Sequence, residues 1–182
     1  MTGSTSATAR HSRRILAGVG VALFLGCLTG CGEPSFPQPG LLRGADGRVE
    51  IYYPTCGDEL TGVRIDKYGT VGVLWQVASP TLASAKSGHV ALGDDTSFSV
   101  VTHPAGAGKF PDKVNVEFDY RSSATGSTAG PGVRNASSSI DIAAVPTKSP
   151  GPGRYWQADV VGEKSVSRTA AELTHQICDR KT

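Results

Sequence analysis

The residues with the greatest capacity for chemistry in this sequence are its four cysteines, Cys27, Cys31, Cys56 and Cys178. A thiolate is a nucleophile and a metal ligand, and two thiols in an oxidising compartment form a disulfide. Cys31 stands between an apolar run, "ILAGVGVALFLGCL", and a Pro/Gly-rich segment, "GEPSFPQPG". The role of Cys31 therefore has to be interpreted together with the apolar run.

The first thirty residues have the order of an export signal. The segment "MTGSTSATARHSRR" is polar and basic without an acidic residue, the apolar run follows it, and the small residues of "TGC" close it. The run has fourteen residues, fewer than the roughly 20 that a membrane-spanning helix needs. Residues 1–30 are therefore predicted to be a cleaved signal peptide.

The four residues Leu28-Thr29-Gly30-Cys31 resemble the bacterial lipobox. The resemblance implies that the Cys31 sulfur carries a diacylglyceryl group, that cleavage follows Gly30, and that the freed amine is often acylated too. Two or more acyl chains anchor a protein stably to a membrane. Cys27 is a weaker rival because bulky residues precede it, and an ordinary cleaved signal with a chance cysteine is the alternative. The predicted location is the outer face of the bacterial cell membrane.

The export route stays open between two systems. Arg13 and Arg14, in "SRRILA", resemble the twin-arginine motif, whereas arginine pairs also occur in ordinary Sec signals. Together with the Ala/Gly-rich composition, this signal resembles those of actinobacterial lipoproteins of unassigned activity. The resemblance implies a location for the protein and no activity.

The remainder has the length and charge of one nearly neutral domain. Without the three arginines of the signal, 15 basic and 16 acidic residues remain, so the surface lacks the positive excess that nucleic-acid binding requires. Residues 31–47, with three prolines and four glycines from Gly32 to Gly47, are predicted to be the lipidated cysteine and a tether. A single domain is expected over residues 48–182.

Alternating hydrophobicity predicts a mainly β domain. The clearest example is "VNVEFDY", in which Val114, Val116, Phe118 and Tyr120 alternate with polar residues, and "TVGVLWQVA" places residues 71, 73, 75 and 77 on one face. We expect about eight strands in an immunoglobulin-like antiparallel sandwich, with an open barrel as the alternative. The candidate strands are residues 48–53, 60–68, 70–78, 88–92, 97–102, 114–120, 139–145 and 154–160.

The C-terminal segment "SRTAAELTHQICDR" is the one predicted helix. Thr169 and Glu172 have the spacing of a capping box. With Cys27 removed and Cys31 lipidated, Cys56 and Cys178 are left to form a disulfide that joins this helix to the sheet. Two free thiols, or part of a metal site, are the alternatives.

No metal, cofactor or nucleotide site is predicted. His89, His103 and His175 are scattered and are interpreted as surface or turn residues, and neither remaining cysteine has a nearby second ligand. Asp94 and Asp95 are interpreted as a turn, because no calcium-loop pattern follows them. The segment "HPAGAGKF" lacks the residues of a phosphate loop and is interpreted as a flexible loop.

The search for function yields two classes. No serine-hydrolase, zinc-protease or penicillin-binding motif is present, which favours a non-enzymatic module that binds an envelope protein or polysaccharide. The alternative is a small envelope hydrolase whose site forms only in the fold. Tyr155 and Trp156 are candidate partner-binding aromatics, although packing in the core is the more common role for such residues. Residues 121–139, rich in Ser and Gly, are predicted to be a mobile or functional loop.

Overall fold

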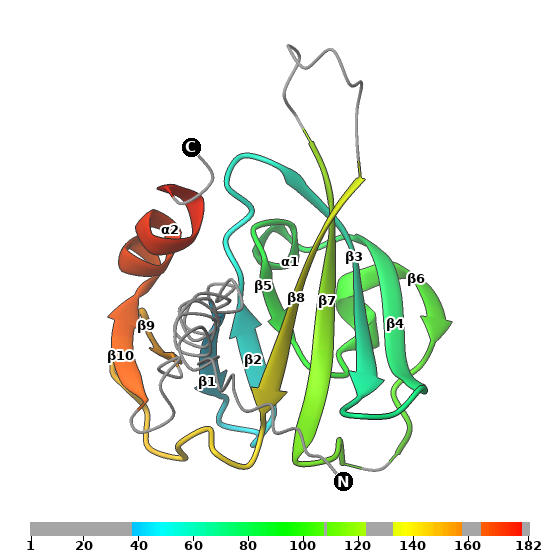
Figure 1. Cartoon of the computed structure of the whole chain (residues 1–182), viewed down its shortest axis with the longest axis horizontal. Helices are drawn as coiled ribbons and strands as arrows, with labels where there is room; N and C mark the ends of the chain where they lie inside the picture. Colours follow the sequence, from blue (N-terminus) through cyan, green and yellow to red (C-terminus); the bar gives the residue numbers. More distant parts are fainter. Residues whose placement is uncertain (1–37, 108, 123–132, 158–164, 180–182) are drawn as a thin grey trace, which may run out of the picture. The chain divides into compact units, whose positions relative to one another are not determined.

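Two antiparallel sheets of five strands form a β-sandwich, with a short helix at the C-terminal end (Figure 1). The computed structural model describes residues 38–107, 109–122, 133–157 and 165–179. The strand order is β10-β9-β1-β2-β5 in the first sheet, here called sheet 1, and β6-β4-β3-β7-β8 in the second, called sheet 2. The predicted immunoglobulin-like antiparallel sandwich is confirmed, with ten described strands where about eight were expected.

The bounds of the elements are as follows. Sheet 1 contains β1 (Gly40–Arg43), β2 (Val49–Tyr52), β5 (His89–Ala91), β9 (Arg154–Gln157) and β10 (Val166–Thr169). Sheet 2 contains β3 (Glu59–Lys67), β4 (Val73–Pro80), β6 (Phe98–His103), β7 (Lys113–Arg121) and β8 (Val133–Asp141). The helices are α1 (Ala83–Lys86), the 3-10 turn η1 (Asp95–Ser97) and α2 (Ala170–Cys178).

The core lies between the sheets and follows the period-two pattern of the sequence. All four apolar residues of β7 are buried, from Val114 to Tyr120, and they alternate with partly exposed polar residues. Trp75 of β4 is fully buried, packs edge-to-face on Phe98 and donates its indole N–H to Asp95 Oδ1 at 2.7 Å. This bond satisfies the one polar group of the largest core side chain.

The folded domain begins before Gly47, the predicted end of the tether. β1 lies within the predicted tether and pairs with β2 from Gly40 to Arg43, and Leu41 is buried. Four strand residues between glycines and prolines are too few to show a period. Gly40 itself belongs to the packing, because a Cβ at this position would lie 2.5 Å from Leu173 Cδ1.

Three further boundaries differ from the sequence prediction. Val71 is fully exposed instead of sharing a face with Trp75, because a turn closes with the Lys67 N–H donating to the Gly72 carbonyl and β4 begins only after it. β8 begins within the expected loop 121–139, and its nine residues, 133–141, pair with β7. It ends at Asp141 rather than Val145. β10, which pairs with β9, was not predicted.

Helix α2 confirms its predicted cap. The Thr169 hydroxyl accepts a hydrogen bond from the Glu172 backbone N–H, and the Glu172 carboxylate accepts one from the Thr169 backbone N–H. The helix buries Leu173 and Ile177. Its last residue, Cys178, forms the predicted disulfide with Cys56, with 5.3 Å between the two Cα atoms. The disulfide joins the helix to the turn that follows β2.

The proposed signal and anchor lie outside the described residues. This applies to Arg13, Arg14, Cys27, the lipobox Leu28-Thr29-Gly30 and the lipidation residue Cys31. Among the residues that the structure does describe, no helix is long and apolar enough to span a membrane.

Candidate functional site

Loops from both sheets meet at one end of the sandwich, the lower end in Figure 1. They line a cleft. Its volume is about 470 Å³, within the range of small-molecule sites. Four segments line it: the β1–β2 turn within residues 43–49, residues 92–93 after β5, residues 105–106, 109–110 and 112 of the β6–β7 loop, and residues 142–143 after β8. Loops carried by a rigid scaffold are common places for binding residues.

The β1–β2 turn sets the first wall of the cleft. The Gly44 N–H donates to the Arg48 carbonyl at 2.8 Å, and the Gly47 N–H donates to the Gly44 carbonyl at 2.9 Å. Gly47 has φ 81°, a left-handed conformation that glycine adopts without steric cost. The tight turn places the side chains of Asp46 and Arg48 next to each other at the cleft.

Arg43 holds this turn against the loop after β8. Its Nη1 donates to the Gly47 carbonyl at 3.0 Å, while its Nη2 donates to the carbonyls of Ile142 at 2.8 Å and Val145 at 3.3 Å. The guanidinium thus joins two cleft walls that are about a hundred residues apart in the sequence. Arg43 therefore has a positioning role in the cleft.

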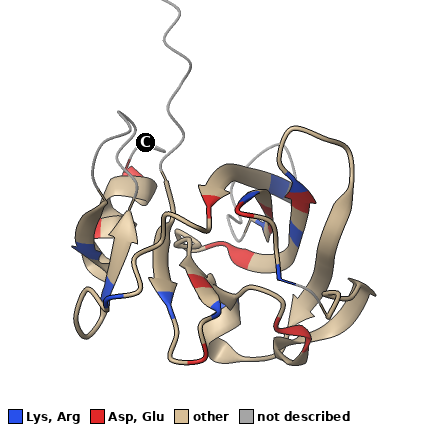
Figure 2. Ribbon diagram, turned by 90° about the horizontal axis from the view of Figure 1, so that it is seen from below, with Lys and Arg blue, Asp and Glu red and all other residues tan. Residues whose placement is uncertain are grey.

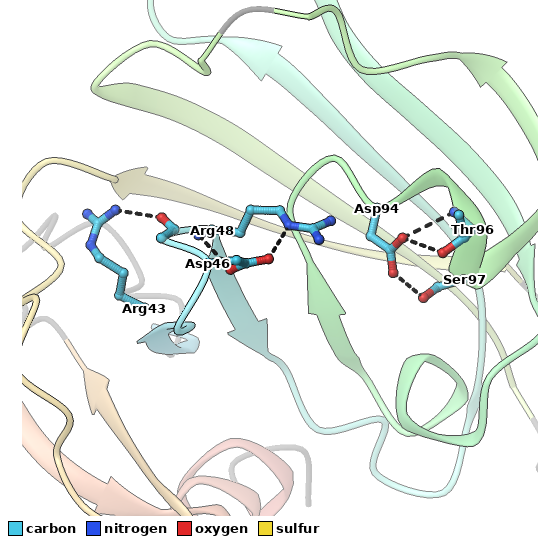
Figure 3. A network of polar contacts seen from close by, with 7 residues as sticks. Arg43, Asp46, Arg48, Asp94, Thr96 and Ser97 are labelled. Carbon is cyan, nitrogen blue, oxygen red and sulfur yellow. Dashed lines mark hydrogen bonds and ion pairs between the residues drawn. The ribbon is translucent and has the colours of Figure 1, made fainter.

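Arg48 and Asp46, which also line the cleft, form an ion pair (Figure 3). The Nε of Arg48 lies 2.5 Å from Asp46 Oδ2, and the Arg48 backbone N–H donates to Asp46 Oδ1 at 3.0 Å. The backbone bond, followed by the side-chain bond, lowers the pKa of Asp46. Asp46 in turn raises the pKa of Arg48 through its hydrogen bond and its charge. Arg48 extends toward Asp94, whose negative charge favours the same protonated form.

The lining of the cleft combines apolar and charged side chains. Along the ribbon in Figure 2, basic and acidic residues are interspersed. The apolar part comes mainly from Val49, Leu92, Phe110 and Ile142. The charged residues are Arg43, Asp46, Arg48, Lys109 and Asp112. Three cations against two carboxylates give the lining one excess positive charge. Within the described ranges, the side chains of Lys109 and Asp112 have no hydrogen-bond or ion-pair partner, so they are available to a ligand.

The aromatic pair predicted as a binding feature is divided between the two sides of sheet 1. Tyr155 stacks on Tyr52, with 5.1 Å between ring centroids, on the side where the Tyr52 hydroxyl meets Thr174 of α2 at 3.1 Å. Trp156 pairs with the buried Leu41 and donates its indole N–H to the Lys148 carbonyl at 3.1 Å. Both side chains are half-buried, and neither lines the cleft. They do not form one common surface.

Two of the described histidines, His89 and His175, lie beside a carboxylate. His89 Nε2 lies 2.9 Å from Glu50 Oε2, and the imidazole packs edge-to-face on Tyr155. In the described part of the chain no serine hydroxyl is bonded to this pair, and the pair does not line the cleft. His103 pairs with Gln76 at the end of β6, and His175 is exposed and forms an ion pair with Asp179. Of these two carboxylate contacts, the one at His89 is the more buried.

The described residues contain no group of three or more His, Cys, Asp or Glu side chains placed to hold a metal ion. Asp94 and Asp95 serve a turn, as predicted. Asp94 accepts hydrogen bonds from the Thr96 backbone N–H, the Thr96 hydroxyl and the Ser97 hydroxyl, and it thereby caps η1 (Figure 3).

Sequence reasoning missed the cleft itself. Its charged residues Arg43 and Lys109 lie in glycine-containing segments that the sequence predicts as tether and flexible loop, and Arg48 is predicted as the first residue of a strand. A usable signal was the topology, because antiparallel hairpins return every second turn to the same end of a sandwich. Comparison with known proteins finds no matching family model, no similar curated protein and no similar solved structure. The functional argument therefore rests on the chain's own residues.

Proposed function

We propose that this chain is an exported, lipid-anchored protein of the bacterial cell envelope, a non-enzymatic module that binds its ligand in the cleft at the end of the sandwich. The observation that carries the binding role is the cleft of about 470 Å³, with its apolar lining and the unpartnered Lys109. The signal-like N-terminus and the lipobox ending in Cys31 support the location. The disulfide supports an oxidising compartment.

The lining favours an amphipathic ligand with one negative group. The apolar side chains, Phe110 above all, suit a short hydrocarbon or ring, and the terminal nitrogens of Arg48 with Lys109 suit a carboxylate or phosphate. Such a group can belong to a free molecule or to the end of an envelope polysaccharide or protein. Specific recognition then requires both the apolar and the positively charged side chains of the lining.

Titration with small probes tests this proposal. Butyl phosphate, butanol and inorganic phosphate are each added to the chain from Gly32 to Thr182 and followed by NMR. Butyl phosphate should bind most tightly and shift the signals of Arg48, Lys109 and Phe110. Arg48→Ala and Lys109→Ala should each weaken it about tenfold, because a hydrogen bond to a charged group contributes roughly 1.5–3 kcal/mol.

Lys86→Ala is the matched control for these variants. Lys86 is exposed in the last turn of α1, beside the start of β5, whereas the cleft lies beyond the end of β5. Loss of the Lys86 side chain should leave the affinity for butyl phosphate unchanged. Signals that shift over the whole surface, or equal weakening by Lys86→Ala and Lys109→Ala, would contradict a binding site in the cleft.

A small envelope hydrolase is the second candidate, and the His89–Glu50 contact is the observation that favours it. A histidine oriented by a carboxylate is part of many hydrolytic sites. The nucleophile that such a site needs is not bonded to this pair in the described chain. The cleft, which has both space and unpartnered charge, supports the binding role better.

A further inference from the structure

Strand β6 is an edge strand with less protection against further pairing than the other described edges. It pairs with β4 on one side, and no described strand covers its other side. Its five residues from Ser99 to His103 are all exposed. The free edge therefore presents unpaired backbone N–H and C=O groups, which extended polypeptide satisfies.

The other three sheet edges are protected. β5 has only three residues, and β10 has four and continues directly into α2. β8 carries the charged residues Arg134 and Asp141, and its Ser138 hydroxyl is bonded to the Gln38 side chain at 2.9 Å. Between Phe98 and His103, by contrast, β6 has no Lys, Arg, Asp, Glu or Pro. Short length, charge, cover and bulges keep strand edges from associating, and of these β6 has only a register shift at Thr102 in its pairing with β4.

From this difference we infer that β6 pairs antiparallel with β6 of a second copy of the chain, about a twofold axis. Opposite residues must share a face of the sheet, so such a pairing places one residue opposite its own copy. The exposed segment Ser99–His103 has Val101 at its centre. Val101 then faces Val101 of the other copy.

The absence of charge is what favours a second copy as the occupant. Around a twofold axis a charged central residue faces an identical charge, which destabilises the pair. β6 has no formally charged residue, and it places β-branched side chains at three successive positions, from Val100 to Thr102. The pairing would join sheet 2 of both copies into one continuous sheet. This inference does not depend on the proposed ligand or on the anchor.

Matched lysine substitutions in the full chain test the inference. Val101 and Val166 are both edge-strand valines of similar exposure, 39% and 40%. Sedimentation in detergent should show that the wild type becomes a dimer as its concentration is raised to about 100 µM. Val101→Lys should raise the dimer dissociation constant about tenfold or more, because like charges then face each other across the axis. Val166→Lys on β10 should leave the dimer dissociation constant unchanged.

Cysteine substitutions provide a second readout that does not depend on strong association. Directly opposite residues of antiparallel strands are close enough for a disulfide, so Val101→Cys should give a covalent dimer on mild oxidation, and Val166→Cys should not. A wild type that remains monomeric, equal loss of the dimer in both lysine variants, or equal cross-linking of both cysteine variants would overturn the inference. A monomer whose β6 pairs with a different protein would overturn it as well.

Discussion

Two adjacent aspartates show how residues of one type take different roles in this fold. Asp94 caps η1 through three hydrogen bonds, whereas Asp95 accepts the indole N–H of the buried Trp75. Burial alone would raise the pKa of Asp94, but the hydrogen bonds from Ser97 and Thr96 outweigh it, and the net pKa is lowered. The turn therefore connects a surface carboxylate with the largest side chain of the core.

Asp94→Asn should destabilise the domain by about 1 kcal/mol at neutral pH, the usual effect of weakening a helix cap. Because the pKa of Asp94 is lowered in the folded state, its stabilising contribution is present above the unfolded value of 3.8 and is lost as the pH falls through the folded value. The stability difference between wild type and variant should therefore shrink below about pH 4. Urea unfolding at pH 7 and pH 3 measures it, and a constant difference would contradict the role of the carboxylate.

Residue-level prediction succeeded where few partners were possible. With two cysteines left for pairing, Cys56 and Cys178 could be joined from the sequence. Arg43 could not be identified, because its partners are backbone carbonyls of residues 142 and 145, and a carbonyl acceptor leaves no trace in residue type. The Arg48–Asp46 pair was local, but its importance depends on a cleft that only the tertiary fold creates.

Elements could be predicted where one face of a strand is buried and the other is polar. β7 shows this alternation over its whole length, and α2 carries its own start signal in Thr169 and Glu172. β8 was hidden by its composition, because a Ser-rich strand paired to β7 needs few apolar residues. β1 was hidden by its shortness. Pairing with neighbours, rather than intrinsic propensity, forms both strands.

Helix α2 depends on tertiary contacts, since nine residues are too few for a stable isolated helix. The Cys56–Cys178 disulfide joins positions 122 residues apart, and in the chain-entropy model such a loop contributes about 4 to 5 kcal/mol by restricting the unfolded chain.

Replacing both cysteines with serine should therefore lower the melting temperature. Even a loss of about 2 kcal/mol would shift the midpoint by roughly 4 to 16 °C in a domain of this size. Differential scanning calorimetry of the oxidised wild type, the reduced wild type and the double variant measures the shift. The reduced protein and the variant should agree. Melting temperatures within about 1 °C in all three samples would contradict a stabilising disulfide.

At the scale of the whole molecule, different regions serve different contacts. The loop end of the sandwich holds the cleft, and the edge of sheet 2 at β6 is open to another strand. The disulfide and α2 lie with sheet 1, where Thr174 contacts Tyr52 of β2. An anchor attached before β1 would leave the cleft, the β6 edge and the core chemically unchanged.

Our central proposal is that Cys31 anchors this domain to the outer face of the cell membrane. Bacteria producing the wild type, Cys31→Ala or Cys27→Ala are labelled with palmitate, and their membranes are washed with carbonate. The wild type and Cys27→Ala should carry label and stay with the membranes, because two or more acyl chains anchor a protein stably. Cys31→Ala should be unlabelled and released with its disulfide intact. Labelled, membrane-retained Cys31→Ala would contradict the account.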